Sequence, residues 1–267
     1  MNLIKGKINL DQINIPKKIH YCWLSKNKFP AKIQKCMETW KVMLPDYEFI
    51  LWDLNNPEIN SNHWVLDAYN NKKYAFAADY IRLYAVYNYG GIYLDTDVEV
   101  LKNFDDLLAL PYFIGTEGDE NIEAGVFGAV KGCEWIGQCL EYYDDKSFIK
   151  NDGTFNTVTL PTIMKSQINK TRKIVEIIND DFSQIKFENS KLFMFPVDFF
   201  CAKNQGTGVI KISKRTYTIH HFAMSWIPKK NTYLPNIKRK LIAFLGVNTI
   251  TFFIRILRLR ELKDKFH

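Results

Sequence analysis

Two carboxylates separated by one residue, Asp95 and Asp97, form the feature of the sequence best suited to chemistry. They follow the double glycine Gly90–Gly91 and the apolar run 92–94. At the end of a buried strand, such a pair could hold one divalent cation, Mn²⁺ or Mg²⁺, which would share its shell with phosphate oxygens. The alternative is a solvated acidic turn. The apolar residues before Asp95 favour the metal site, because they place the acids at the edge of a core where unpaired charge is unfavourable.

A second pair of charged residues, Asp79 and Arg82, lies three positions apart in a helix predicted over 75–88, so both side chains share one helical face. A surface ion pair of this kind would contribute about 0.5 kcal/mol. The neighbouring residues are apolar, however, which indicates a buried helix. A guanidinium binds phosphate and a carboxylate accepts hydrogen bonds from sugar hydroxyls, so the pair suits recognition of a sugar phosphate.

Aromatic and imidazole side chains supply the remaining candidates. Trp23 ends the first predicted strand and could either stack on a nucleobase or belong to the core. His220 and His221 are adjacent in a predicted late strand and must point to opposite faces, so only one of them could complete a metal shell. Ser225 and Trp226 follow and would lie on a loop able to close over a diphosphate.

The elements that must position these residues alternate along the chain. Strands are predicted at 15–23, 47–52, 92–94, 112–115, 125–130 and 217–222, and helices at 30–44, 75–88 and 134–143. This alternation predicts an α/β fold with a mainly parallel sheet flanked by helices. Ligands of such sheets bind beyond the carboxyl ends of the strands, where Trp23, Asp95 and Asp97 fall.

The length of the chain indicates the number of domains, and its cysteine content indicates the cellular compartment. The chain has 267 residues, which suits one sizeable α/β domain, predicted here over 1–235. The five cysteines are odd in number and match no zinc spacing, so we expect reduced thiols. The first residues show no hydrophobic signal region. These features predict a cytoplasmic protein.

The positive charge is concentrated near the C-terminus. Residues 238–267 hold eight Lys or Arg and two acidic residues, which leaves only +1 of the net charge of +7 for residues 1–237. This argues against a nucleic-acid-binding face. Apolar residues recur there at helical spacing, in a stretch shorter than a membrane span. We therefore predict a basic amphipathic helical tail over 236–267 that lies on an anionic membrane surface; the alternative is a helix packed on the domain.

With these motifs together, the chain resembles the glycosyltransferases of family 32 and, more distantly, the catalytic domains of the large clostridial glucosylating toxins. The matching stretches are 15–23, 78–83, 90–98 and 220–226. The resemblance implies a GT-A fold, retention of the anomeric configuration and a nucleotide-sugar donor. It also implies that Asp79, Arg82, Asp95 and Asp97 form the catalytic centre.

The resemblance implies a role around the donor for each candidate residue. Trp23 would stack on the base, and Asp79 and Arg82 would hold the donor sugar. Asp95 would contact the ribose and the metal ion, and Asp97 would ligate the metal directly. The remaining roles would be completion of the metal shell by His220 or His221 and contact with the β-phosphate by Ser225 and Trp226.

The function expected from the sequence is a retaining hexosyltransferase that uses Mn²⁺ or Mg²⁺. It would move a hexose or N-acetylhexosamine from a nucleotide sugar, UDP being favoured, to a glycan acceptor carried on a lipid. Synthesis of capsule or lipopolysaccharide at the inner face of the plasma membrane would suit such an enzyme. Two alternatives are a toxin-like transferase that modifies a protein and a non-catalytic nucleotide-sugar-binding membrane protein.

Overall fold

The computed structural model describes residues 14–118, 121–178 and 185–223 of the chain. The predicted tail over 236–267, together with Ser225 and Trp226, lies outside the described residues. Within the described part, no helix is both long and apolar enough to cross a bilayer. All five cysteines are buried and free.

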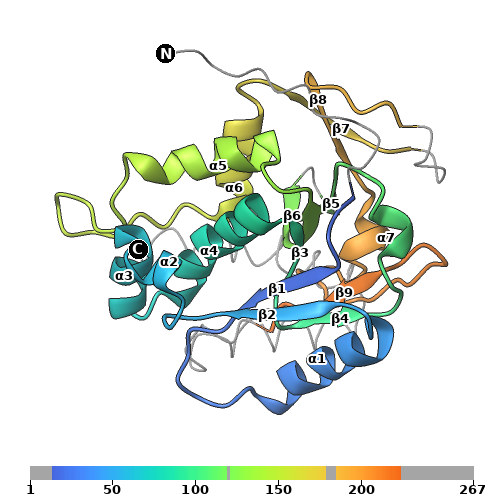
Figure 1. The fold of residues 1–267 in the computed structure, drawn as a ribbon, viewed down its shortest axis with the longest axis horizontal. Helices are drawn as coiled ribbons and strands as arrows, with labels where there is room; N and C mark the ends of the chain where they lie inside the picture. The colour runs from blue at the N-terminus through green and yellow to red at the C-terminus, as the bar shows by residue number, and fades with distance from the viewer. Residues whose placement is uncertain (1–13, 119–120, 179–184, 224–267) are drawn as a thin grey trace, which may run out of the picture.

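A five-stranded sheet forms the centre of the molecule, in the order β2-β1-β3-β6-β5 (Figure 1). The strands are β1 (Lys18–Cys22), β2 (Glu48–Trp52), β3 (Gly91–Leu94), β5 (Tyr112–Gly118) and β6 (Asn121–Ala129). β1 runs parallel to both β2 and β3. β6 runs antiparallel to β3 on one side and to β5 on the other.

The prediction of a mainly parallel sheet is therefore corrected to a mixed sheet. β5 and β6 follow each other with only residues 119–120 between them, and such a short connection can join only antiparallel strands. The parallel part consists of β2, β1 and β3, which are linked through helices. Sequence periodicity identified strands near β5 and β6 but contained no information on their direction.

Helices cover both faces of the sheet. α4 (Tyr74–Tyr89), α5 (Glu134–Asp144) and α6 (Leu160–Ile168) pack on one face, and α1 (Ala31–Met43) lies on the other (Figure 1). β3 shows how one strand serves two cores. Tyr93 belongs to the cluster under α4, whereas Ile92 and Leu94 belong to the cluster on the α1 side, because successive side chains of a strand alternate in direction.

The double glycine ends α4 and starts β3. Gly90 has φ +63° and donates its N–H to the carbonyl of Val86 at 2.9 Å, which closes the helix. Gly91 has φ +108°, and a Cβ there would lie 2.8 Å from the carbonyl oxygen of Lys18 on β1. Only glycine allows this turn and this close approach, so the motif fixes where α4 ends and where β3, which leads to the two acids, begins.

Two smaller sheets complete the described part. β4 (Val98–Val100) pairs antiparallel with β9 (Thr218–His220), and β7 (Lys173–Glu176) pairs parallel with β8 (Lys191–Met194). The remaining helices are α2 (Pro57–Asn60), α3 (His63–Asn70), α7 (Val197–Phe200) and a 3₁₀ turn at Asp105–Leu107. The β4–β9 pair matters most for the site, because it joins the residues after Asp97 to the late histidines.

Candidate functional site

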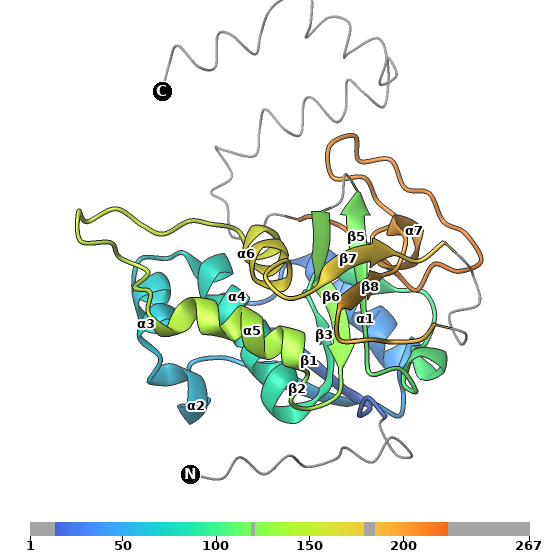
Figure 2. The same cartoon turned by 90° about the horizontal axis from the view of Figure 1, so that it is seen from above.

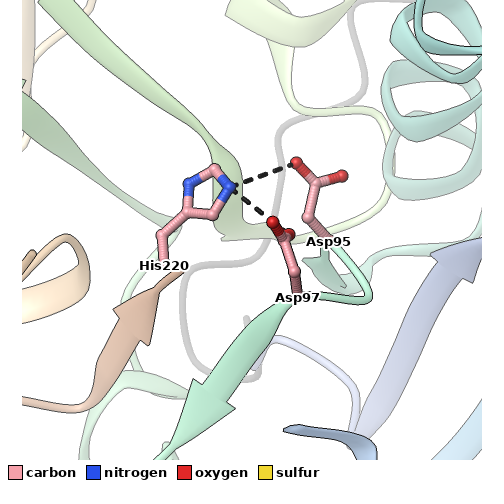
Figure 3. Close-up of side chains that lie close together, drawn as sticks. All are labelled: Asp95, Asp97 and His220. Atoms are coloured by element: carbon pink, nitrogen blue, oxygen red, sulfur yellow. Dashed lines mark ion pairs between the residues drawn. The ribbon is translucent and has the colours of Figure 1, made fainter. Parts of the chain in front are cut away.

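Three predicted residues from distant parts of the sequence converge at one point. One ligand atom each from Asp95, Asp97 and His220 lie within 4.8 Å of one another (Figure 3). His220 Nε2 is 3.4 Å from Asp97 Oδ1 and 3.9 Å from Asp95 Oδ2. The pairing of β4 with β9 sets Val98 opposite His220, and this register brings the imidazole to the acids.

A buried carboxylate that the sequence analysis did not identify holds His220 in place. Both oxygens of Glu123 lie beside His220 Nδ1, at 3.0 and 3.1 Å. Glu123 is only 1% exposed, and its Oε1 also accepts the N–H of Gly125 at 2.6 Å. Because Nδ1 faces Glu123, Nε2 faces the two acids. A carboxylate that binds the far nitrogen of a histidine is a common way to orient a metal ligand.

Gly125 allows these groups to come this close. A Cβ at this position would lie 2.8 Å from the Glu123 carboxylate, 2.8 Å from the His220 ring and 2.9 Å from the Asp95 carboxylate. Any other residue would push the site apart. Phe222 stacks on the His220 ring, with 4.1 Å between ring centroids, and restricts the imidazole further.

On the α4 side, Arg82 bridges two carboxylates. Its Nη1 is 3.2 Å from Asp95 Oδ2, and its Nη2 is 3.2 Å from Asp79 Oδ1. Nη1 also donates to the carbonyl of Ala124 at 2.8 Å. Tyr93 donates its hydroxyl to Asp95 Oδ1 at 3.0 Å, and its ring lies under the guanidinium at 4.7 Å. The Arg82 side chain is 8% exposed, so Asp79 and Arg82 do not form a surface ion pair.

The pKa values follow from this arrangement. Burial alone would raise the pKa of Asp97, but the charge of His220 and the N–H of Ala223, 2.6 Å from Oδ2, lower it to about 2. Burial raises the pKa of Asp79 to about 6, against the opposing effect of Arg82. Burial would lower the pKa of His220, but its acidic neighbours outweigh burial and raise it. A positive charge between Asp97 and the other acids is therefore strongly favoured here.

The residues fit a divalent metal ion. Two carboxylates and an imidazole nitrogen aimed at one point are a suitable set of protein ligands, and further positions would remain for phosphate or water. The local charge agrees with this, since four carboxylates of this cluster are paired with two cationic side chains. These groups are Asp79, Asp95, Asp97 and Glu123 on one hand and Arg82 and His220 on the other.

The second histidine of the pair lies elsewhere. His221 Nε2 is 2.7 Å from Glu99 Oε2, on the opposite side of the strand from His220. The inclusion of His221 among the possible metal ligands is therefore corrected. The reason is the alternation of side chains along an extended chain. Its backbone N–H still binds the carbonyl of Asp97 at 3.1 Å and thereby helps to fix the acidic turn.

A cavity of about 490 Å³ opens over the cluster, a volume in the range of small-ligand sites. Residues singled out in the sequence line it: Trp23, Asp79, Arg82, Asp95, Asp97 and His220. Trp23 packs its ring on Phe29 at 4.7 Å and donates Nε1–H to the carbonyl of Asn27, so it is held at the cavity wall.

Two further charged residues line the cavity and were not expected. Lys28 lies in the loop that follows Trp23, and Glu117 lies at the end of β5. Burial, together with the charge of Glu123, raises the pKa of Glu117 to about 7. A lysine in a polar loop and an acid near a hairpin turn carry no sequence signal that separates them from solvated residues. Glu123 had a weak signal, as the one acid between apolar residues at the start of β6.

A comparison with protein families connects this geometry to a known region. Residues 30–114 match the family model described as a glycosyltransferase sugar-binding region containing the DXD motif. The matched segment includes α1, α4 and β3, and with them Asp79, Arg82, Asp95 and Asp97. Trp23 and His220 lie outside it.

Curated proteins of similar sequence include lipid-modifying enzymes of yeasts. Inositol phosphoceramide mannosyltransferase 3 of Schizosaccharomyces pombe is 35% identical over 130 residues, which cover 47% of this chain and 36% of that protein. A mannosyl phosphorylinositol ceramide synthase of Saccharomyces cerevisiae is 31% identical, over 51% of this chain and 37% of that protein. The chain thus matches about a third of the length of these relatives. An uncharacterized glycosyltransferase of Acanthamoeba polyphaga mimivirus is 25% identical, over 71% of this chain and 76% of that protein.

Solved structures with a partial likeness are also glycosyltransferases. The PaToxG glycosyltransferase gives a TM-score of 0.45 at 19% identity, over 59% of this chain and 69% of that one. The galactosyltransferase LgtC gives a TM-score of 0.40 at 11% identity, over 85% of this chain and 95% of that one. Both likenesses are too weak to assign the fold or the function.

Proposed function

We propose that this protein is a metal-dependent glycosyltransferase of the GT-A type that moves a hexosyl group from a nucleotide sugar to a lipid-linked acceptor. The observation that carries the proposal is the convergence of Asp95, Asp97 and His220 in one cavity. The DXD pair belongs to a segment that matches a glycosyltransferase sugar-binding region. The cavity supplies the polar and aromatic groups that a sugar nucleotide requires.

Residues on the α4 side would bind and orient the donor sugar. Asp79 lines the cavity, and its carboxylate could accept a hydrogen bond from a sugar hydroxyl. Arg82 holds Asp79 and Asp95 at fixed positions through its two terminal nitrogens. Trp23 offers a flat apolar surface at the cavity wall for the nucleobase. This fixed framework would place the donor without reorganisation of the site.

The departing diphosphate must be stabilised as its bond to the sugar breaks. A cation held by Asp95, Asp97 and His220 would neutralise the negative charge that develops there. Lys28 lines the same cavity and would add a second positive charge. Ser225 and Trp226, which lie outside the described residues, would contact the β-phosphate. Retention of configuration would follow from attack of the acceptor on the face that the phosphate leaves, with the phosphate taking the acceptor proton.

The names of the relatives indicate which substrates to test first. They are mannosyltransferases of inositol phosphoceramide, so a mannosyl donor and an acceptor hydroxyl on a lipid headgroup are favoured here as well. GDP-mannose is therefore to be tested before the UDP sugars that the sequence analysis favoured. A role in capsule or lipopolysaccharide synthesis at the inner face of the plasma membrane remains part of the proposal.

A donor screen tests the proposed function directly. The purified protein is incubated with GDP-mannose, UDP-glucose, UDP-galactose or UDP-N-acetylgalactosamine, with and without Mn²⁺, and the released nucleotide is measured. We expect slow hydrolysis of one donor that requires Mn²⁺, and the same donor should raise the melting temperature most. Asp97→Asn should abolish hydrolysis, whereas the control Asp152→Asn, on an exposed loop, should not. Equal hydrolysis by Asp97→Asn and the unmodified protein would contradict the proposal.

A further inference from the structure

The loop that follows α7 has an unusual charge. Residues 201–217 contain four basic residues and no Asp or Glu, although residues 1–237 as a whole carry a net charge of only +1. The basic residues are Lys203, Lys211, Lys214 and Arg215. Lys211 and Lys214 are exposed. Figure 2 shows the loop, in orange, projecting from the body of the molecule.

The same segment also exposes apolar side chains. Ten large hydrophobic residues are exposed within the described ranges; three of them come from the stretch between α7 and β9, and a fourth, Val197, is the first residue of α7. Ile212 is 61% exposed, Val209 and Ile210 are each 43% exposed, and Val197 is 39% exposed. A concentration of this kind, interleaved with lysines, differs from isolated surface hydrophobics, which need no explanation.

Hydrogen bonds hold the loop in a defined shape. Asn204 N–H donates to Val209 O at 2.9 Å, and Lys211 N–H donates to Ala202 O at 2.8 Å, which closes a hairpin-like turn. Further along, Ser213 Oγ and Arg215 Nε bind the carboxylate of Asp198 on α7, at 2.8 and 2.7 Å. The exposed residues therefore sit on an ordered part of the surface.

The loop continues into the wall of the candidate site. Gln205, at the turn of the hairpin, lines the cavity. Lys203 Nζ donates to the carbonyl of His221 at 2.8 Å, directly beside His220. A partner that contacts the loop would therefore lie next to the cavity that holds the three metal-binding candidates.

We infer that one surface of the molecule rests on an anionic lipid bilayer. This surface, here called the α7 loop surface, is formed by Val197, Val209, Ile210, Lys211, Ile212 and Lys214. Its apolar side chains would enter the headgroup region, and its lysines would be attracted by acidic headgroups. Such a contact would bring a lipid-linked acceptor to the mouth of the cavity. This use of the surface depends on the proposed function, but the contact with lipid is a separate property of a different segment from the predicted tail.

Vesicle binding by the full-length chain tests the inference. Partition is measured by cosedimentation with phosphatidylcholine vesicles, with and without phosphatidylserine. A charge variant carries Lys211→Gln and Lys214→Gln, and an apolar variant carries Val209→Ser, Ile210→Ser and Ile212→Ser. The matched control carries Lys41→Gln and Val42→Ser on α1, where Val42 is 74% exposed beside an exposed lysine.

We expect the charge variant to bind phosphatidylserine vesicles about 30-fold more weakly than the unmodified chain. The apolar variant should lose affinity for both kinds of vesicle, and the α1 control should bind like the unmodified chain. Mn²⁺-dependent donor hydrolysis and the melting temperature should be unchanged in all variants. If the loop variants bind as tightly as the control, or if the unmodified chain does not bind vesicles, the inference is overturned. The hydrolysis assay judges the proposed function independently of that result.

Discussion

The two acids of the DXD motif lie in different surroundings, although only one residue separates them. Asp95 is held from the α4 side by Arg82 and by the hydroxyl of Tyr93. Asp97 faces β9 and is held by His220 and by the backbone N–H of Ala223. The first acid is thus paired with a permanent cation that cannot leave, and the second with an imidazole that could instead become a metal ligand.

This difference separates the structural half of the site from the half that could exchange its partner. On the α4 side, two largely buried carboxylates share one guanidinium, so its removal would leave their charges uncompensated. On the β9 side, Glu123 holds the ring by Nδ1 and leaves Nε2 directed at Asp97 and Asp95. Changes on the first side should therefore act on stability and donor binding, and changes on the second side on metal binding.

The largest effect is expected from loss of the Asp97 carboxylate. Asp97→Asn keeps the shape of the side chain but removes its charge, and we expect sugar transfer or donor hydrolysis to fall by about 1,000-fold. The rate is measured at saturating Mn²⁺ and again over an Mn²⁺ titration. Circular dichroism should show an unchanged fold. A rate within about threefold of that of the unmodified enzyme would contradict the distinction drawn between Asp95 and Asp97.

The α4 side is tested by Arg82→Met, which leaves Asp79 and Asp95 close together without their shared cation. The free energy of unfolding should drop by about 3 kcal/mol, as measured by urea denaturation. Arg215→Met is the matched control, because the Arg215 side chain is 36% exposed whereas that of Arg82 is 8% exposed; there the loss should stay under about 1 kcal/mol. Equal losses in the two variants would show that the buried bridge has no special role in stability.

A smaller effect is expected from the second layer on the β9 side. Glu123→Gln should weaken Mn²⁺ binding by about 10- to 100-fold, since it changes the partner that orients His220. The chain offers a matched control in Glu99→Gln, which makes the same chemical change beside His221 on the other side of the strand. Isothermal titration measures both affinities. If the two variants bind Mn²⁺ alike, Glu123 does not orient a ligand.

The smallest effect is expected from His221→Gln. This side chain is about a third exposed and pairs with Glu99 rather than with the acidic cluster, so its loss should cost about 0.5 kcal/mol of stability. Donor hydrolysis should change by less than about threefold. A loss of activity as large as that of Asp97→Asn would mean that the histidine facing the metal had been identified wrongly.

Local patterns predicted the parallel half of the fold well. The helices α1, α4 and α5 begin and end within a few residues of the predicted ranges, because apolar periodicity and Gly or Pro boundaries mark them. The strands β1, β2 and β3 were identified by short apolar runs. The acidic turn after β3 could be predicted because Gly90 and Gly91 mark the end of one element and the start of the next.

Local sequence patterns could not predict which strands pair with each other in the folded structure. β4 has only three residues, too few for a period, and its alignment with β9 links positions 98 and 220. That register decides which histidine meets the acids. Glu123 is similar: its burial depends on the antiparallel course of β6, which the sequence alone did not reveal. The mixed sheet and the partner of His220 are therefore both consequences of the direction of β6, which local patterns did not predict.

The central claim is that Asp95, Asp97 and His220 hold one divalent cation. Electron paramagnetic resonance of Mn²⁺, titrated into the full-length chain in the presence of GDP or UDP, measures this without any acceptor. The account predicts one tightly bound ion per chain, with an affinity at least about tenfold lower in Asp97→Asn and in His220→Gln but unchanged in His221→Gln. Binding that is the same in all four proteins would contradict it.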